Sequence, residues 1–251
     1  MTTVFGSGLF LTDALLGPAL GAAAARPLFT HYDDATGERV ELSGTTTANW
    51  TAKAANLLRD ECDVEPGTRI AVLLPAHWQT AAVLLAGWSC GAELVGDPAA
   101  ADVVLVDAAR LDTALAAGAA TVVAFSLDAF GRGLTGLPAG TIDFATEVRV
   151  HGDEFVPWDP VDGDAPAWDG ASGAQVLDAA RARAPELGIA AGDRVLSTAG
   201  WDSAEGLRDG LLAVLAAGAS LVQVVNPSGD AAALDHRAET ERCTVRLSSL
   251  V

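Results

Sequence analysis

The chain carries one short sequence pattern twice. Pro66-Gly67-Thr68-Arg69-Ile70, with Gly91-Ala92-Glu93-Leu94-Val95 behind it, returns as Ala191-Gly192-Asp193-Arg194-Val195, with Gly218-Ala219-Ser220-Leu221-Val222 behind it. The distance in sequence from Gly67 to Gly91, and from Gly192 to Gly218, is long enough for one strand, one helix and the start of the next strand. The pattern therefore predicts an α/β protein with two repeated βαβ half-domains and mixed or parallel sheets.

The apolar periodicity predicts the elements around the repeat. We expect a helix over 7–25, a hairpin from 28–32 and 39–42, and a helix capped by Thr46 or Thr47 that runs to about Asp60. Further strands are expected at 70–74, 94–95, 103–106, 121–125, 194–198, 220–225 and 244–247, and further helices at 78–90, 111–117, 171–184, 205–217 and 231–241.

Composition changes in the middle of the chain predict the domain organisation. Residues 1–150 form the leading helix, the hairpin and a first α/β subdomain, 151–170 an acidic Gly/Pro-rich connection, and 171–251 a second, truncated α/β subdomain. Half of all residues are apolar, which suits a globular protein with a sizeable core.

The charge excludes two classes of partner. A formal net charge of −18 disfavours nucleic acids and anionic membranes, which bind clustered lysine and arginine. The apolar runs are far shorter than the roughly 20 residues of a membrane-spanning helix. No basic residue precedes Arg26, so the start does not resemble a secretory signal, and we expect a cytoplasmic protein.

The cysteines and histidines show no metal-ligand spacing. Three cysteines, Cys62, Cys90 and Cys243, suit reduced and mostly buried thiols. The four histidines are scattered, which predicts no metal site, and no cofactor is expected.

Two motif matches have the wrong context. Gly131–Gly136 fits the dinucleotide pattern G-x-G-x-x-G, but Leu137-Pro138 follows where a helix should continue, so we favour a surface loop. Gly87–Gly91 fits the nucleophile pattern G-x-S-x-G, but lies between a helix and a strand rather than a strand and a helix. Gly91 is therefore expected to end a helix.

Two further clusters allow a binding and a structural interpretation. Asp159, Asp162, Asp164 and Asp169 offer oxygen ligands to a cation such as calcium, but their spacing favours an acidic solvated loop. Ser43–Thr47 has phosphate-loop composition, yet helix capping explains its hydroxyls.

The repeated segments carry a family resemblance. Ala48–Leu58, Glu65–Pro75 and Trp78–Val95 resemble the opening helix, the Pro-Gly-Asp-Arg-Val strand and the following helix and Gly-Ala strand of the AMP-binding, adenylate-forming enzymes, which include the acyl-CoA synthetases. Gly188–Leu196 and Leu211–Val222 resemble the matching pieces of that family's second subdomain. The resemblance implies the fold of the N-terminal part of acyl-CoA synthetases. More narrowly, the chain is similar to short, uncharacterised actinobacterial AMP-binding-like proteins.

The motifs that carry activity in that family have no counterpart. Its S-G-T-T-G-x-P-K-G phosphate loop falls on the acidic segment Val161–Asp169, where a carboxylate about 4 Å from a phosphate oxygen is unfavourable by about 4 kcal/mol at a dielectric near 20. The sole tyrosine, Tyr32, lies far from a Tyr-Gly-x-Thr-Glu motif, and the sole lysine, Lys53, lies on an early helix. We therefore expect no catalytic residue of the family.

Three functional hypotheses remain open. The first is a non-catalytic binding or regulatory module for an acyl or adenine-like small molecule, or for a protein partner. The second is one half of a split ligase, or an enzyme of another reaction that uses His77 with a nearby aspartate. The third is a pocketless interaction scaffold. Parallel sheets bind ligands beyond the carboxyl ends of their strands, so a crevice there, between the half-domains, is expected to be lined by Pro75, His77, Trp78, Thr198, Trp201 and Asp202. The sequence leaves the oligomeric state open.

Overall fold

A computed structural model describes residues 10–247, which divide into two compact units. Within this range unit 1 contains residues 10–13, 48–75 and 79–176, and unit 2 contains residues 14–47, 76–78 and 177–247. Both units are mixed α/β structures, as the sequence predicts. The helices are α1 (Phe10–Leu16), α2 (Gly44–Cys62), α3 (Trp78–Ser89), α4 (Leu111–Ala117), α5 (Phe144–Glu147), α6 (Gly173–Glu186), α7 (Ala204–Leu207), α8 (Ala213–Ala216) and α9 (Ala231–Thr240).

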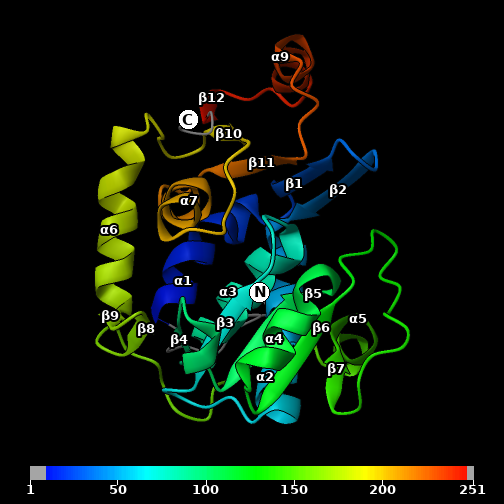
Figure 1. Ribbon diagram of the computed structural model, residues 1–251. Helices are drawn as coiled ribbons and strands as arrows, with labels where there is room; N and C mark the ends of the chain where they lie inside the picture. The colour runs from blue at the N-terminus through cyan, green and yellow to red at the C-terminus, as the bar shows by residue number, and fades with distance from the viewer. Residues whose placement is uncertain (1–9, 248–251) are drawn as a thin grey trace. The chain divides into compact units, whose positions relative to one another are not determined.

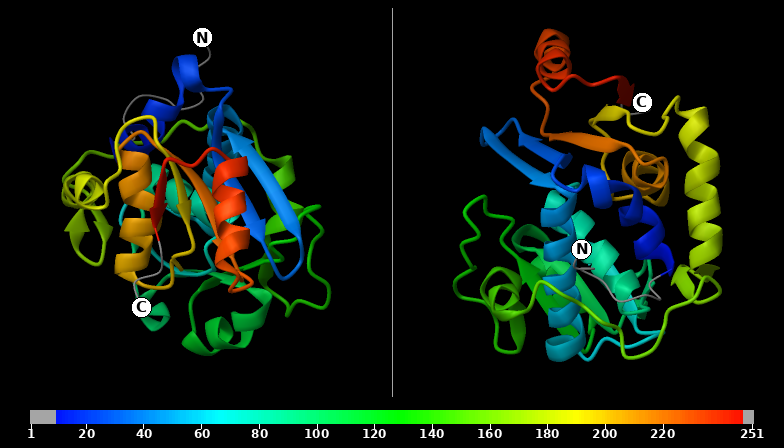
Figure 2. Two further views of the ribbon diagram at one scale, coloured as in Figure 1. Left: turned by 90° about the horizontal axis from the view of Figure 1, so that it is seen from above. Right: turned by 180° about the vertical axis from the view of Figure 1, so that it is seen from behind.

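The strands of unit 1 form a sheet in the order β7-β6-β5-β3-β4-β8-β9. All of its described pairings are parallel except that of β8 with β9. Helix α4 covers one face of this sheet, and α2 and α3 cover the other (Figures 1 and 2). The strands are β3 (Arg69–Leu73), β4 (Glu93–Leu94), β5 (Val103–Asp107), β6 (Thr121–Phe125), β7 (Thr141–Asp143), β8 (Pro166–Trp168) and β9 (Ala171–Ser172).

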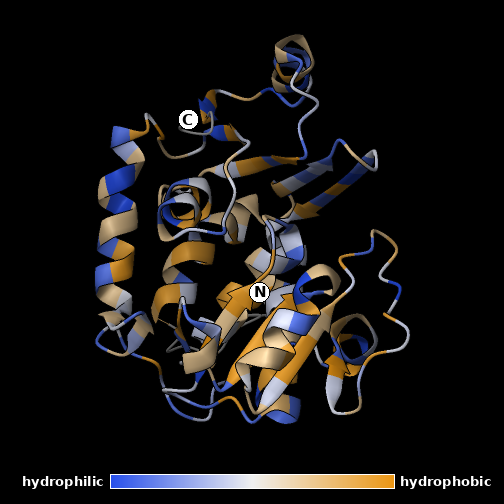
Figure 3. Ribbon diagram, in the orientation of Figure 1, coloured by the Kyte–Doolittle hydropathy of each residue, from blue (hydrophilic) through white to orange (hydrophobic). Residues whose placement is uncertain are grey.

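The central strands of unit 1, β3, β5 and β6, are apolar except for one polar residue at an end of each, and Figure 3 shows their hydrophobic character. Val104, Leu105 and Val106 are fully buried although successive side chains point to opposite faces. Parallel strands covered on both faces require such unbroken apolar runs. This is why the sequence pattern identified these strands.

Unit 2 has a smaller sheet in the order β12-β10-β11-β1-β2. Strand β1 pairs parallel with β11 and antiparallel with β2, so the hairpin lies at one end of this sheet. In Figure 1 α9 lies on one side of β11 and α7 on the other. The strands are β1 (Pro27–Asp33), β2 (Glu38–Ser43), β10 (Arg194–Ser197), β11 (Ser220–Val225) and β12 (Val245–Leu247).

The two similar segments adopt the same local structure. The Gly67 N–H donates to the Gly91 carbonyl at 2.9 Å, and the Gly192 N–H donates to the Gly218 carbonyl at 3.1 Å. All four glycines have a positive φ, between 72° and 90°, which a residue with a Cβ rarely adopts. Their recurrence at matching places therefore has a backbone reason.

The division into units differs from the predicted domains 1–150, 151–170 and 171–251. The hairpin, expected in the first subdomain, belongs to unit 2 because β1 pairs with β11. The predicted connection 151–170 lies in unit 1, where it contributes β8 to the sheet.

Two of the predicted elements also differ. The helix expected over 7–25 ends at Leu16, and short 3₁₀ turns follow from Gly17, because proline at 18 has no N–H to continue an α-helical ladder. Residues 7–9 of that prediction lie outside the described residues. Ser43, rather than Thr46 or Thr47, caps α2: its Oγ accepts the Thr46 N–H at 3.1 Å.

The structure confirms the structural interpretation of two motifs. No helix begins within Gly131–Gly136, and α5 starts only at Phe144. Ser89 is fully buried near the end of α3, where its hydroxyl donates to the Leu85 carbonyl at 2.8 Å, so it is not an exposed nucleophile.

Candidate ligand-binding site

Unit 2 contains a cavity of about 600 Å³ beside the carboxyl end of β10. The end of α6, the loop that follows β10, α7 with the π-helical turn Arg208–Leu212, and β12 form its wall. Its described lining residues are Arg183, Glu186, Leu187, Ala199, Gly200, Asp202, Ser203, Glu205, Gly206, Asp209, Gly210, Arg246 and Leu247.

Hydrogen bonds hold the loop that follows β10. The Ala199 N–H donates to Ser197 Oγ at 3.1 Å, and Gln223 Nε2 on β11 donates to the Ala199 carbonyl at 3.0 Å. Ser203 then caps α7 by accepting the Gly206 N–H at 3.0 Å. The loop is therefore tied to the sheet at one end and to a helix at the other.

Glycines let this loop approach the helix closely. A Cβ at Gly206 would lie 2.2 Å from the Gly200 carbonyl oxygen, and a Cβ at Gly210 would lie 2.9 Å from Trp201 Nε1. Trp201 is 7% exposed, and its Nε1 has no hydrogen-bond partner among the described residues. Buried indole N–H groups usually have an acceptor, so this N–H group, packed against Gly210, is an unsatisfied donor.

An ion pair fixes one side of the cavity. Arg183 on α6 donates to both carboxylate oxygens of Asp209, with distances of 2.8–3.1 Å. Burial alone would raise the pKa of Asp209, but hydrogen bonds from Arg183 and Arg208 outweigh it and lower that pKa. Asp209 therefore stays charged and keeps the π-helical turn against α6.

The charges of the lining disfavour a polyanion. Four carboxylates face two arginines, and both arginines are already in ion pairs, Arg183 with Asp209 and Arg246 with Asp235. The described lining includes no histidine, cysteine, lysine or tyrosine. The arrangement can hold a small molecule, and its described side chains form no nucleophile and base pair of the usual types.

The six predicted site residues lie in different surroundings. Asp202 lines the cavity, whereas Trp201 and Thr198 are only neighbours in sequence of lining residues. The Thr198 N–H donates to the carbonyl of Leu247 at 3.4 Å. Pro75 belongs to unit 1, where its carbonyl accepts the Thr80 hydroxyl at 2.7 Å. The crevice between the half-domains stays a prediction.

His77 and Trp78 belong to unit 2 and are both buried. The His77 ring lies 5.5 Å from the Trp78 ring and 4.4 Å from the His31 ring, and its Nε2 is 3.9 Å from Glu38 Oε1. Burial, and then the neighbouring His77, lower the pKa of His31 to about 4, so His31 is neutral at pH 7. The sequence did not indicate this grouping.

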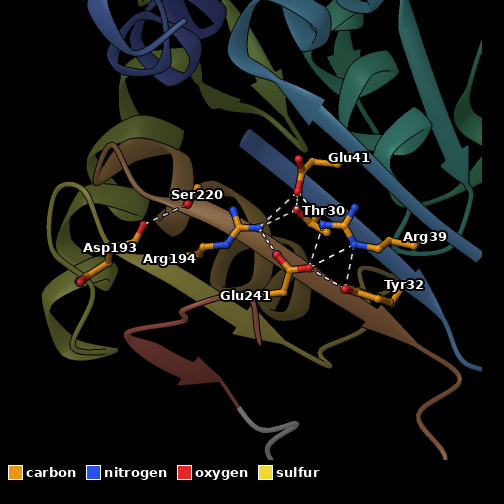
Figure 4. Close-up of polar contacts among 8 residues, drawn as sticks. All are labelled: Thr30, Tyr32, Arg39, Glu41, Asp193, Arg194, Ser220 and Glu241. Atoms are coloured by element: carbon orange, nitrogen blue, oxygen red, sulfur yellow. Dashed lines mark hydrogen bonds and ion pairs between the residues drawn. The ribbon is translucent and has the colours of Figure 1, made fainter. Parts of the chain in front are cut away.

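A second polar cluster lies around Glu241, just after α9 (Figure 4). Its carboxylate accepts the Tyr32 hydroxyl at 2.6 Å, Arg194 Nη2 at 2.6 Å and Arg39 Nη2 at 2.9 Å. Arg194 is the arginine of the repeated segment, and it also donates to Thr30 Oγ1 at 2.8 Å. The cluster joins the hairpin, β10 and the end of α9 into one network, which is a structural role.

Comparison with known proteins gives one close relative in sequence and several in fold. No protein-family model matches the chain. A Mycobacterium tuberculosis (strain ATCC 25618 / H37Rv) protein described as a TIGR03089 family protein is 53% identical over 239 residues, which cover 93% of this chain and 96% of that protein.

Solved acyl-CoA and aryl-CoA ligases share the fold. A Brucella canis acyl-CoA synthetase has a TM-score of 0.78 at 20% identity, over 97% of this chain and 48% of that one. The anthranilate CoA ligase AuaEII, solved in complex with anthranoyl-AMP, has a TM-score of 0.75 at 14% identity, over 96% and 50%. The acetoacetyl-CoA synthetase of Streptomyces lividans has a TM-score of 0.74 at 19% identity, over 97% and 43%. The chain spans about half the length of these structures.

Proposed function

Since the chain belongs to the TIGR03089 family and has the fold of the N-terminal part of acyl-CoA synthetases, we propose that it is a non-catalytic binding or regulatory protein for a small molecule. The cavity beside β10 is the observation that carries this proposal.

The acidic segment Val161–Asp169, which stands where the adenylate-forming enzymes are expected to carry their phosphate loop, supports the absence of ATP chemistry. Its backbone groups serve the fold of unit 1: the Asp169 N–H donates to the Leu94 carbonyl at 2.9 Å, and Trp88 Nε1 donates to the Ala167 carbonyl at 3.0 Å. A phosphate loop requires free N–H donors and a nearby cation. This segment instead presents carboxylates, which repel phosphate.

The position of the sole lysine supports the same conclusion. Lys53 on α2 donates to the His151 carbonyl at 2.6 Å and pairs with Asp153 at 2.9 Å. Its ammonium group therefore holds the end of the 3₁₀ turn that follows α5, rather than offering a charge to a substrate.

The lining of the cavity favours an uncharged ring or acyl group over a triphosphate. Small-molecule sites combine apolar wall with a few polar groups that set orientation. Leu187, Ala199 and Leu247 supply apolar surface, and the Ser203 hydroxyl supplies a donor. An acyl carbonyl or an adenine nitrogen can accept from this hydroxyl, and the ligand is proposed to belong to one of these two classes.

Thermal-shift titration of the full chain with AMP, CoA, a fatty acid and a fatty acyl-CoA tests the proposal, because a ligand of the native state raises Tm. We expect at least one acyl or adenine compound to raise Tm. Glu205 is exposed and lines the cavity, so Glu205→Trp is expected to fill part of the cavity. Glu239→Trp, on the exposed side of α9, introduces the same side chain away from the cavity and is the matched control.

The outcomes separate the three functional hypotheses. Loss of the Tm shift in Glu205→Trp, with the shift retained in Glu239→Trp, supports binding in this cavity. A shift of equal size in both variants shows that the compound binds elsewhere. No shift with any compound favours an interaction scaffold, and pyrophosphate exchange on addition of a lysine-bearing partner protein favours the split-ligase alternative.

A further inference from the structure

His31 and Glu38 lie on one face of the hairpin because of its register. Asp33 of β1 pairs with Glu38 of β2, and His31 pairs with Val40. Side chains two residues apart on a strand share a face, so His31 and Asp33 point the same way, and Glu38, opposite Asp33, shares that face. Thr30, Tyr32 and Arg39 occupy the other face, where they meet Glu241 (Figure 4).

His77 joins this pair from a distant part of the sequence. One ligand atom each from His31, Glu38 and His77 lies within 4.8 Å of the others. The side chains of His77 and Glu38 are 5% and 12% exposed, and His31 is 3% exposed. Three groups that bind metal ions therefore converge in a space that water barely reaches.

The polar atoms of two members lack partners. His31 Nδ1 and Glu38 Oε1 have no hydrogen-bond partner among the described residues. A buried acceptor or donor without a hydrogen-bond partner is destabilising, and more so when the group is charged. A positive ion between the three side chains removes this penalty, because imidazole nitrogen and carboxylate oxygen both become ligands.

We propose that His31, Glu38 and His77 bind one divalent transition-metal ion of the zinc type. Two imidazoles and one carboxylate are a common ligand set for Zn²⁺ and leave the fourth tetrahedral position for water or another oxygen ligand. Hard ions such as Mg²⁺ and Ca²⁺ prefer sites made of oxygen alone. The histidines therefore select against them.

Binding of an ion requires the three ligand atoms to move closer together. Ligand atoms about 2.0–2.1 Å from a tetrahedral ion are about 3.3 Å apart. His77 Nε2 and Glu38 Oε1, at 3.9 Å, have to approach by about half an ångström, and a pair at the 4.8 Å limit of the cluster by about 1.5 Å. Rotation of the side chains supplies movements of this size. The bound ion would fasten residues 76–78 to the hairpin, so its binding and the stability of unit 2 are coupled.

Cobalt titration of the chelator-stripped, untagged full chain tests the site, since Co²⁺ bound by nitrogen and oxygen ligands absorbs visible light. We expect saturation at one ion per chain, displacement by Zn²⁺, and a rise in Tm with Zn²⁺. His31→Ala and His77→Ala are expected to weaken binding by about 100-fold or more. His236→Ala, on the exposed side of α9, is the control and keeps full affinity.

A second variant tests the site in case the alanine variants lose Co²⁺ binding because they misfold. Glu38→Gln keeps the size of the side chain and removes its charge, and circular dichroism reports whether each variant is folded. A folded Glu38→Gln chain with at least about tenfold weaker Co²⁺ binding supports the site. The proposal is overturned if the wild-type chain shows no saturable binding, or if folded Glu38→Gln and His236→Ala bind Co²⁺ as tightly as the wild-type chain does.

Discussion

At the scale of single residues, Glu241 connects three parts of unit 2 through one carboxylate. Its side chain is 7% exposed and faces Arg39, Arg194 and Tyr32. Two guanidinium groups would lose their shared partner if this charge were removed. Burying a cation with too few partners is more costly than exposing one.

Glu241→Gln is therefore expected to lower the free energy of unfolding by about 2–3 kcal/mol. Urea unfolding followed by circular dichroism measures the change. Glu239→Gln, two residues earlier and exposed, is the matched control, with an expected change within about 0.5 kcal/mol. Equal effects of the two substitutions would show that the network around Glu241 contributes little.

The same carboxylate predicts a dependence on pH. Burial by itself raises the pKa of Glu241, but hydrogen bonds from Tyr32, Arg194 and Arg39 outweigh it and lower that pKa from 4.5 to about 2. The unfolded chain then takes up the proton at a higher pH than the folded chain does. The stability that Glu241 contributes is complete above about pH 4.5 and is lost as the pH falls towards 2.

Urea unfolding of the wild-type chain and of Glu241→Gln, repeated across this range, checks the sign. The difference in stability between the two is expected to shrink as the pH falls from about 4.5. A difference that stays constant would mean that the carboxylate keeps the same pKa in the folded and unfolded chains.

At the scale of elements, the loop after β10 and the helix α7 touch through a glycine. Replacing a helical glycine by alanine ordinarily stabilises a helix by up to about 1 kcal/mol. At Gly206 the added Cβ would lie 2.2 Å from the carbonyl oxygen of Gly200, which is backbone and moves only with the loop. The usual gain is therefore expected to reverse.

We expect Gly206→Ala to destabilise the chain by about 1–3 kcal/mol, as overpacking does. Gly17→Ala is the control, because a Cβ at Gly17 meets nothing within 4 Å. Thermal unfolding of both variants measures the change in Tm that each substitution causes. A higher Tm for Gly206→Ala would show that the loop does not rest on α7 in solution.

The sequence predicts the helices and strands of this fold where local patterns determine them. The extents of β5, β6, β11 and α4 follow the predicted ranges within one residue, because apolar runs and flanking glycines depend on neighbours in sequence. The sequence predicts one regular helix over 205–217, whereas the structure has the π-helical turn Arg208–Leu212 within it. Its extra residue per turn leaves no mark in the hydrophobic period.

The candidate sites were less readable, because they depend on pairing over long distances. The rule that ligands lie beyond strand ends predicts Asp202 as a site residue. No such rule indicates Arg183 and Asp209, which become neighbours only when α6 packs beside the π-helical turn. His31 and Glu38 lie close together in sequence, on the two strands of the hairpin, which is only a weak indication that their side chains meet. Nothing in the sequence near His77 indicated that it would join them.

At the scale of the molecule, the reactivity of the cysteine thiols measures whether unit 1 is folded. Cys62 and Cys90 are buried there, and burial raises the pKa of each thiol to about 12. Cys243 in unit 2 is only partly buried. A thiolate is the reactive form, so exposure and pKa together predict the order of reaction.

A disulfide reagent at neutral pH is expected to modify Cys243 in the native chain, and Cys62 and Cys90 only when urea unfolds unit 1. The variant Cys243→Ser should therefore show almost no reaction before unfolding. Rapid modification of two thiols in native Cys243→Ser would contradict the packing of α2 against α3.

The molecule as a whole combines a ligase-like fold with a segment that repels phosphate. Its charge of −18 adds to the repulsion, and the cavity beside β10 offers paired arginines rather than free ones. We therefore expect the chain to bind a small molecule in this cavity and not to bind a triphosphate.

Calorimetric titration of the full chain with ATP and Mg²⁺ at moderate salt tests this claim most directly. We expect no saturable heat up to about millimolar ATP, which corresponds to less than about 4 kcal/mol of binding free energy. Saturable binding of one ATP per chain at micromolar concentration would contradict it, and would return the chain to the class of proteins that use ATP.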